Sequence, residues 1–317
     1  MRAVWLTRFG GPEVLVPSQA PEPVPGPGQA LVAVEFAGIT FIETVFRAGR
    51  PGPFTGQPPL IPGNGVGGVV AAVGPDVDRA LVGRRVVSGT GGSGGYAERA
   101  VVDAAGVVEV PEGVAMDAAV ALLADGRTAT MLVRAAQLRP GERVLVEAAA
   151  GGVGTLLVQL ASSAGARVVA AAGGSQKLRL AGELGAEFTV DYGRADWPQW
   201  TREAVGGLDV VFDGVGGEVG RSAFELLERG GRMLRYGFAG GAWTQIDDQE
   251  ASQRGVTLLQ PRPRPEEFRE LIANVLAEAA AGRLRPVIGQ RFPLEQAAAA
   301  HAAIEGRATI GKTLLVI

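Results

Sequence analysis

A glycine-rich segment is the strongest chemical signal in the chain. An apolar run, residues 144–146, leads through Glu147 and three alanines into Gly151-Gly152-Val153-Gly154. Against the pattern G-x-G-x-x-G, alanine stands at the first place, while Gly151 and Gly154 fill the other two. Gly151 would let the backbone approach a pyrophosphate, and Gly154 would let a helix pack closely on a strand. The free N–H groups at the helix start favour an anion. The segment therefore predicts a dinucleotide site formed by Gly151, Gly152, Val153 and Gly154, with a glycine-rich turn that binds nothing as the alternative.

The next strand and turn indicate which dinucleotide binds. An NAD site usually carries Asp or Glu about 20 residues past the glycines, but here no acid follows before Glu183. The turn contains Gly173, Ser175 and Lys177 instead. The Lys177 charge, the Ser175 hydroxyl and the amide at the helix start would suit a 2′-phosphate. A solvated surface lysine is the alternative, and we favour NADPH.

The amino-acid composition excludes several other kinds of site. The chain has no cysteine and one histidine, His301. The chain therefore has no ligands for a structural zinc site or an iron–sulfur cluster. It also cannot form a disulfide or use a cysteine nucleophile. A Ser-His-Asp triad would depend on His301 alone. Because His301 lies in an alanine-rich helical stretch, we expect it to be structural or at the surface.

Charge and hydropathy define the expected environment. A formal net charge of −3 disfavours a nucleic-acid-binding protein, which usually has a basic face. The first residues lack the apolar core of a signal peptide. The longest uncharged stretch, residues 148–166, contains four glycines and is better explained by a buried strand, turn and helix than by a membrane span. We expect a cytoplasmic protein that binds neither nucleic acid nor membrane.

Two patterns divide the 317 residues. Up to about residue 122, short valine-rich runs between Gly and Pro predict a small β barrel or sandwich. Strands and helices then alternate up to about residue 261, which predicts a parallel sheet with right-handed crossovers. The terminal apolar strand, residues 313–317, needs a sheet to join, and the β-rich first part is its expected host. The alternating elements are strands at 143–147, 167–172, 188–191, 209–213 and 232–237, and helices at 153–164, 175–184, 197–205 and 219–229. Ser175 is the expected N-cap of its helix. Two further helices are expected at 265–281 and 294–305.

Residues 9–15, 37–44, 94–98, 148–154 and 307–312 carry a family resemblance that extends over essentially the whole chain. The chain resembles the zinc-independent, zeta-crystallin-like quinone oxidoreductase branch of the medium-chain dehydrogenase/reductase superfamily. The resemblance implies an α/β protein with a GroES-like β-rich catalytic domain (residues 1–122 and 262–317). A Rossmann doubly wound parallel-sheet domain (residues 123–261) would be inserted into it, with the active site in the cleft between them. It also implies a homodimer, paired through the sheet edge at residues 256–260.

The resemblance also implies roles for particular residues. Lys177 and Tyr192 match the family's positions for the 2′-phosphate of NADPH. The positions that match the nicotinamide side are Thr128, Val215, Tyr236, Gly237 and Phe238. Lys312 matches a further cofactor-side position.

Departures from the family pattern concern metal and substrate. Zinc-dependent relatives carry a His-Glu pair after Pro-Gly, whereas here Asn64 and Gly65 follow Pro62-Gly63. The branch commonly has Asn, Asp and Tyr where this chain has Thr40, Glu43 and Val45, so Thr40 is the candidate catalytic hydrogen-bond donor in a smaller, more apolar pocket. For Glu43 we expect a positioning or solvated role, with a proton relay as the alternative. Tyr96 is expected to pack in the core.

These observations predict an NADPH-dependent reductase that transfers a hydride to a quinone or an α,β-unsaturated carbonyl compound without zinc. An enoyl-thioester reductase is one alternative, and it would need a basic entrance for a carrier phosphate. A non-catalytic, crystallin-like protein that binds NADPH is the other.

Overall fold

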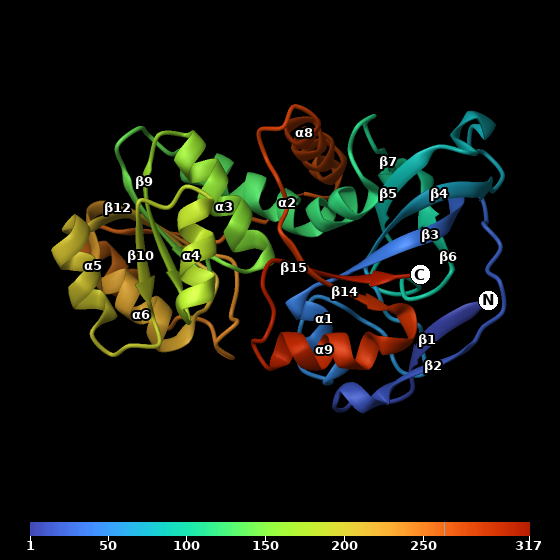
Figure 1. Cartoon of the computed structure of the whole chain (residues 1–317), viewed down its shortest axis with the longest axis horizontal. Coiled ribbons are helices and arrows are strands. Elements are labelled where there is room, and N and C mark those ends of the chain that lie inside the picture. The colour runs from blue at the N-terminus through green and yellow to red at the C-terminus, as the bar shows by residue number, and fades with distance from the viewer. Residues whose placement is uncertain (263) are drawn as a thin grey trace. The chain divides into compact units, whose positions relative to one another are not determined.

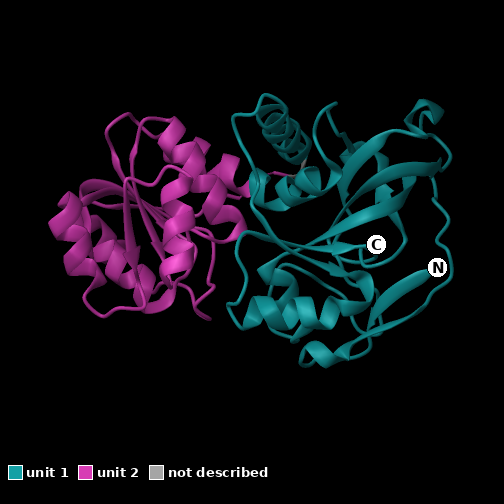
Figure 2. Cartoon of the chain, in the orientation of Figure 1, with its two compact units in different colours: residues 1–127, 265–317 teal, residues 128–264 magenta. Residues whose placement is uncertain are grey.

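The computed structural model describes residues 1–262 and 264–317, and the chain forms two compact units. Unit 1 comprises residues 1–127 and 265–317, and unit 2 comprises residues 128–264 (Figure 2). The sequence analysis put these borders at 122/123 and 261/262. The first observed border lies within helix α2 (Met116–Ala136), which the sequence analysis does not predict. Pro263, in the segment that links unit 2 back to unit 1, lies outside the described residues.

Unit 1 is organised around the long strand β3 (Figure 1). Its sheet runs in the order β14-β15-β3-β4-β5-β7, and β6 also pairs with β3. On one edge, the first part of β3 pairs with β6 and the last part with β15, while β4 pairs along the other edge. The strand bounds are β1 Arg2–Leu6, β2 Leu15–Gln19, β3 Gln29–Ile39, β4 Gly65–Val73, β5 Arg85–Gly89, β6 Arg99–Asp103, β7 Val108–Glu109, β14 Ile288–Pro293 and β15 Lys312–Val316.

Alternation of side chains along β3 explains why this strand forms the core of unit 1. Ala30, Val32 and Val34 are at most 8% exposed, whereas the residues between them point away from this core. The terminal strand β15 lies between β14 and β3, which confirms that the C-terminus joins the β-rich sheet. The helices of unit 1 are α1 Phe41–Arg47, α8 Phe268–Ala280 and α9 Ala297–Glu305, and α9 packs against α1.

Unit 2 contains the predicted parallel sheet. Its strands run in the order β10-β9-β8-β11-β12-β13, and each neighbouring pair is parallel. The order reverses between β8 and β11, where a doubly wound sheet forms its ligand crevice at the carboxyl ends of the strands. The bounds are β8 Arg143–Glu147, α3 Gly152–Ser163, β9 Arg167–Ala172, α4 Ser175–Glu183, β10 Phe188–Asp191, α5 Trp197–Val205, β11 Leu208–Asp213, α6 Gly217–Glu225, β12 Leu227–Arg235, α7 Asp248–Arg254 and β13 Thr257–Leu259.

Three local predictions need correction. The helix expected over 219–229 spans Gly217–Glu225, because β12 already begins at Leu227 and pairs with β11. Ser175 does not cap α4 as expected but is its first residue, after Gly174 at φ +88°. The helices expected at 265–281 and 294–305 each begin with a short 3-10 turn before α8 and α9.

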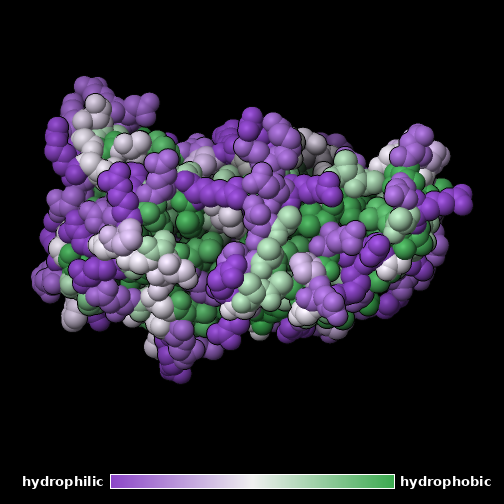
Figure 3. Space-filling view, turned by 90° about the horizontal axis from the view of Figure 1, so that it is seen from above, coloured by the Kyte–Doolittle hydropathy of each residue, from purple (hydrophilic) through white to green (hydrophobic). Residues whose placement is uncertain are grey.

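The described residues include no helix long and apolar enough to cross a membrane. On the face shown in Figure 3, hydrophilic residues lie among the hydrophobic ones.

Candidate functional site

The turn between β8 and α3 has the close packing that the glycine pattern predicts. A Cβ atom at Gly154 would lie 2.2 Å from the carbonyl oxygen of Ala148 and 2.8 Å from the Cα of Ala149. Ala148 itself adopts a left-handed conformation, with φ +47°. Only glycine at residue 154 therefore lets α3 approach the end of β8 so closely.

The start of α3 suits an anionic ligand. No side chain caps the helix at Gly151, and its first turn contains no acidic residue. The helix N-terminus therefore combines N–H donors with a favourable dipole for a phosphate group. A Cβ at Gly151 would lie 3.2 Å from the Ala148 carbonyl oxygen, and no other neighbouring atom crowds it. Gly151, Gly152, Val153 and Gly154 thus fit the pyrophosphate of a dinucleotide.

A second turn, after β9, brings together the residues predicted for the 2′-phosphate. Because β9 and β10 are parallel neighbours, with Ala172 opposite Asp191, the turn at Gly173 lies beside Tyr192. A Cβ at Gly173 would be 3.7 Å from the Tyr192 ring. Ser175 and Lys177 occupy the first and third positions of α4.

Asp191, the last residue of β10, borders this turn, and the sequence analysis missed its role. Its Oδ2 accepts a hydrogen bond from the Gly174 N–H at 3.1 Å, and its Oδ1 accepts one from the Gly193 N–H at 2.8 Å. A carboxylate therefore lies beside the turn despite the absence of an acid in the segment that follows β9. The Gly174 N–H already donates to Asp191. Lys177 remains the cation predicted to bind the 2′-phosphate.

Two buried carboxyl groups position the loops after β11 and β12. Glu147 Oε2 accepts the Val215 N–H at 3.0 Å, and Asp213 Oδ1 accepts the Gly216 N–H at 2.7 Å. Asp213 Oδ2 also accepts the Thr244 hydroxyl at 2.5 Å. Glu147 and Asp213 are fully buried. The carboxyl groups thus hold Val215, a residue predicted to line the nicotinamide, in a defined loop conformation.

The turn Tyr236-Gly237-Phe238 folds back onto the same loop. The Tyr236 and Gly237 N–H groups both donate to the Asp213 carbonyl, at 3.0 and 3.3 Å. A Cβ at Gly237 would lie 2.6 Å from the Gly214 carbonyl oxygen, so glycine is required for this approach. Phe238 contacts Trp243, with ring centroids 5.1 Å apart. The predicted nicotinamide-side residues Val215 and 236–238 therefore lie together in unit 2.

Burial raises the pKa of Glu147 well above its ordinary value of 4.5, and the neighbouring Asp213 carboxylate raises it further. Hydrogen bonds from the Val215 and Gly214 N–H groups oppose this shift but are smaller in effect. Glu147 is therefore the member of the pair that favours the protonated form. Asp213 accepts four hydrogen bonds: its side chain accepts from Gly216 and Thr244, and its carbonyl accepts from Tyr236 and Gly237.

The remaining predicted residues are distributed over both units. Thr128 lies in α2 at the first residue of unit 2 and is half-buried. Lys312, in unit 1, is 4% exposed, and its ammonium group pairs with Asp125 Oδ1 at 3.1 Å. Asp125 therefore balances the charge of Lys312 within unit 1. Its predicted cofactor-side role remains a prediction.

Thr40, the predicted catalytic residue, immediately precedes α1 and is half-buried. Glu43 reaches back from the first turn of the helix: its Oε2 accepts the Thr40 N–H at 2.6 Å and the Thr40 hydroxyl at 2.8 Å. This is the acidic half of a capping box, which the spacing Thr40–Glu43 encodes locally. Val45 is 5% exposed. Glu43 is 3% exposed, so of the two expectations for it the solvated one is wrong.

Tyr96 and His301 form a buried polar pair that the sequence analysis did not predict. The Tyr96 hydroxyl lies 2.9 Å from His301 Nε2 and 3.4 Å from Glu43 Oε1, and both rings are 0% exposed. His301 is thus in the core, not at the surface, and Tyr96 does more than pack. This pairing has no local sequence signal, because the two residues are 205 positions apart in the chain.

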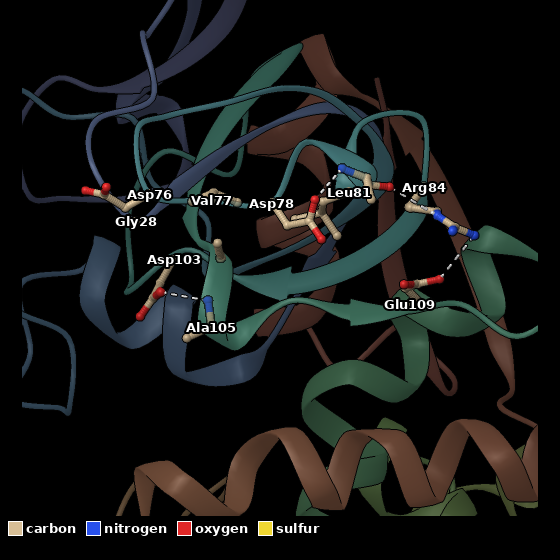
Figure 4. A pocket seen from close by; sticks show the side chains of 11 residues that line it. Gly28, Asp76, Val77, Asp78, Leu81, Arg84, Asp103, Ala105 and Glu109 are labelled. Carbon is tan, nitrogen blue, oxygen red and sulfur yellow. Dashed lines mark hydrogen bonds and ion pairs between the residues drawn. The ribbon is translucent and has the colours of Figure 1, made fainter.

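A surface hollow of about 480 Å³ in unit 1 is unrelated to these groups (Figure 4). Two of its acidic side chains accept local backbone hydrogen bonds: Asp78 accepts the Ala80 N–H, and Asp103 accepts the Ala105 N–H, each at 2.9 Å. None of the residues predicted for catalysis or cofactor binding lines the hollow. Within residues 1–262 and 264–317, no cluster of three or more His, Cys, Asp or Glu side chains could hold a metal ion.

Comparison with known proteins identifies relatives along the whole chain. Residues 26–112 match the family model described as alcohol dehydrogenase GroES-like domain, and residues 152–277 match the one described as zinc-binding dehydrogenase. A quinone oxidoreductase of Pseudomonas aeruginosa is 33% identical, covering 99% of both chains. A 2-haloacrylate reductase of a Burkholderia species is 32% identical, covering 99% of this chain and 98% of the relative. A mycobacterial structure complexed with NADPH is 34% identical, with a TM-score of 0.92 and full coverage of both chains.

Replacing Gly154 by alanine is expected to destabilise unit 2 and to weaken dinucleotide binding. The new Cβ would overlap the Ala148 carbonyl oxygen, and such overpacking costs about 1–3 kcal/mol. Urea denaturation and NADPH titration measure the two effects. Gly182→Ala, in α4, is the matched control: nothing lies within 4 Å of its Cβ position, so this variant should gain about 0.5–1 kcal/mol. Equal stability of the two variants would contradict the packing argument.

The buried Glu147 carboxyl predicts a pH-dependent stability. Because its pKa is raised in the folded state, the folded protein binds more protons than the unfolded chain. Stability is then greatest below pH 4.5 for this group and falls by about 1.4 kcal/mol per pH unit until the folded-state pKa is reached. Glu147→Gln should remove this decline in urea denaturation measured across pH. Glu142→Gln, whose carboxyl has a lowered pKa beside Arg232, should leave the decline in place.

Proposed function

The chain belongs to the zeta-crystallin-like quinone oxidoreductase branch of the medium-chain dehydrogenase/reductase superfamily, and from this premise we propose that it reduces a quinone or an α,β-unsaturated carbonyl compound. It is an NADPH-dependent oxidoreductase with a GroES-like part and a parallel-sheet dinucleotide-binding part. The observation that carries the proposal is the arrangement in unit 2 of the Gly151–Gly154 turn, the Lys177 turn and the Val215 loop along the carboxyl ends of one parallel sheet.

The cofactor supplies a hydride from its nicotinamide ring when it is bound. The chain's own residues bind and orient it: the N-terminus of α3 receives the pyrophosphate, and Lys177, Ser175 and Tyr192 surround the 2′-phosphate. Val215, Gly237 and Phe238 line the nicotinamide, with Thr128 beside them. In unit 1, Thr40 donates a hydrogen bond to the substrate oxygen, where negative charge develops.

A second acceptor class has a specific observation in its favour. The 2-haloacrylate reductase is as similar to this chain as the quinone oxidoreductases are. Its name describes a reductase of 2-haloacrylate, a compound with a carbon–carbon double bond next to a carboxylate. This similarity supports enone-like acceptors alongside quinones, and the apolar Val45 is consistent with small acceptors.

We propose that the reaction needs no zinc. Asn64 and Gly65 stand where zinc-dependent relatives carry their His-Glu pair, and the Asn64 N–H donates to Glu43 Oε1 at 3.0 Å. The position thus contributes a backbone hydrogen bond to the Thr40–Glu43 group.

A panel assay tests the proposed function. NADPH oxidation is followed with quinones, enones, 2-haloacrylate and enoyl-thioesters, before and after dialysis against a strong chelator. We expect turnover with a quinone or an enone at a rate that the chelator leaves unchanged. Turnover confined to enoyl-thioesters would favour the alternative reductase, NADPH binding without any turnover would favour a binding protein, and activity restored by added zinc would overturn the metal-free reaction.

Selectivity for NADPH over NADH should depend on Lys177. A charge-assisted contact with the 2′-phosphate contributes about 1.5–3 kcal/mol, so Lys177→Ala should weaken NADPH binding roughly 10- to 100-fold and leave NADH nearly unchanged. Arg179→Ala, on the exposed part of the same helix, is the matched control and should change neither affinity. Fluorescence titration measures both cofactors. Equal affinities of the unmodified protein for NADPH and NADH would contradict the assignment.

We also propose a cytoplasmic homodimer. Strand β13 ends the sheet of unit 2, and its outer edge pairs with no other strand among the described residues. An unpaired edge favours pairing with a second copy. Light scattering that gives 32.6 kDa, the mass of one chain, would argue against the dimer.

A further inference from the structure

A buried chain of polar side chains in unit 1 leads to the Thr40 hydroxyl. It runs from His301 on α9 through Tyr96 to Glu43 on α1, with contacts of 2.9 Å between His301 and Tyr96 and 3.4 Å between Tyr96 and Glu43. The last contact, from Glu43 Oε2 to Thr40 Oγ1, is 2.8 Å. The proposed function uses only Thr40, so the buried groups behind it need an explanation of their own.

The hydrogen bonds of this chain have a preferred direction. His301 is neutral, because burial lowers its pKa to about 3, with the nearby Arg47 charge acting in the same direction. Its Nδ1 has no hydrogen-bond partner among the described residues. A buried N–H without an acceptor costs more than an unused ring nitrogen lone pair. We therefore assign the proton to Nε2, which donates to the Tyr96 oxygen, and the Tyr96 hydroxyl then donates to Glu43 Oε1.

The Thr40 hydroxyl has one hydrogen, and the protonation state of Glu43 determines which acceptor this hydrogen can reach. When Glu43 is ionised, the Thr40 hydroxyl donates to the carboxylate and offers only lone pairs to a substrate. When Glu43 is protonated, its own O–H donates to Thr40 Oγ1, and the Thr40 hydrogen is free to donate to another acceptor. Thr40 can therefore act as the predicted donor only in the protonated state of Glu43.

Charged groups around Glu43 come from several elements, and each cation has its own carboxylate. Lys312 on β15 pairs with Asp125 on α2, and Arg47 on α1 pairs with Glu305 on α9. The other neighbours are neutral: Tyr96, His301 and the backbone N–H groups of Thr40 and Asn64. Burial is the dominant influence on Glu43 and raises its pKa, against the hydrogen bonds from Thr40 and Asn64 and the Lys312 charge.

We propose that Glu43 carries a proton in the resting protein and delivers it, through the Thr40 hydroxyl, to the anion formed when the substrate accepts a hydride. This step rests on the proposed function. The electron pair reaches the substrate with the hydride. The Thr40 Oγ1–H bond breaks as its proton passes to the substrate anion, and the Glu43 Oε2–H bond breaks as its proton restores the Thr40 hydroxyl. The products are the neutral reduced substrate and a Glu43 carboxylate.

The geometry also provides a way to reload Glu43. Glu43 is 3% exposed, whereas Thr40 is half-buried. After the product leaves, a solvent proton can return through the Thr40 hydroxyl along the same hydrogen bond. Tyr96 and His301 stay neutral throughout and hold Glu43 Oε1, which makes them positioning residues.

The test is the pH dependence of kcat at saturating NADPH. In the unmodified protein, kcat should fall about tenfold per pH unit above the pKa of Glu43, because the donor form is lost. Glu43→Gln cannot titrate, so its kcat should be low and independent of pH, and Thr40→Val should behave alike, with a loss of about 100-fold or more. Thr40→Ser keeps the hydroxyl and should keep the decline. Glu295→Gln, at a surface carboxylate that pairs with Arg2, is the matched control and should leave the profile unchanged.

A second measurement does not depend on turnover. Glu147 keeps a protonated carboxyl in every variant, so the infrared spectra are compared by subtraction. The spectrum of the unmodified protein minus that of Glu43→Gln should contain a protonated-carboxyl band that disappears above the pKa of Glu43, whereas subtraction of the Glu295→Gln spectrum should leave no such band. Circular dichroism checks that each variant is folded. An unchanged pH decline in Glu43→Gln, or no difference in this band between Glu43→Gln and the unmodified protein, would overturn the proposal while the reductase function stands. If the unmodified protein binds NADPH but reduces no acceptor, the proposed function fails, and the delivery step fails with it.

Discussion

The contact between Gly154 and the backbone of Ala148 is the constraint on which the cofactor side of unit 2 depends. It brings the first turn of α3 against the end of β8, where a side chain at residue 154 would overlap a carbonyl oxygen. The same turn is joined to its neighbour strand, because the Ala149 N–H donates to the Ala171 carbonyl at 3.1 Å. Ala171 lies two residues before Gly173, where the second turn begins. Backbone contacts therefore set the spacing of the two turns that are predicted to bind the pyrophosphate and the 2′-phosphate, and side chains would add selectivity.

Asp191 is an acidic residue beside the turn that is predicted to select NADPH over NADH. Its carboxylate holds the Gly174 and Gly193 amides, so it shapes the turn that presents Lys177. In an NAD enzyme, an acid about 20 residues past the glycines binds the ribose 2′-OH. Asp191, at the end of β10, binds backbone amides instead. Because both of its oxygens already accept backbone hydrogen bonds, its charge is partly compensated. Lys177 is the cation that we propose for the 2′-phosphate.

Local patterns in the sequence predicted local structure well. The strands at 143–147 and 167–172 and the helix at 197–205 have the predicted bounds, because apolar runs and turn residues specify them within a few positions. The parallel sheet of unit 2 followed from its alternating elements. The end of α6 was wrong, because pairing of β12 with β11 overrides the helical pattern after Glu225. The Tyr96–His301 contact had no local signal at all, since it forms only when α9, which carries His301, meets the segment between β5 and β6 that carries Tyr96. The Thr40–Glu43 contact was predictable in part. Its spacing in the sequence is that of a capping box, but the burial of Glu43 depends on the folded sheet.

Glu43 in unit 1 and Glu147 in unit 2 stabilise loops in the same way. Each is a buried carboxyl whose oxygens accept backbone N–H groups from a loop that carries a predicted site residue. Burial raises the pKa of each, so each favours the protonated form, which orients a loop without placing a full negative charge in the core. Their surroundings distinguish their roles. Glu147 faces the Asp213 carboxylate and is 0% exposed, so its proton has no route to a ligand. Glu43 contacts a half-buried hydroxyl, and this single contact turns a structural carboxyl into one that can exchange its proton with a substrate.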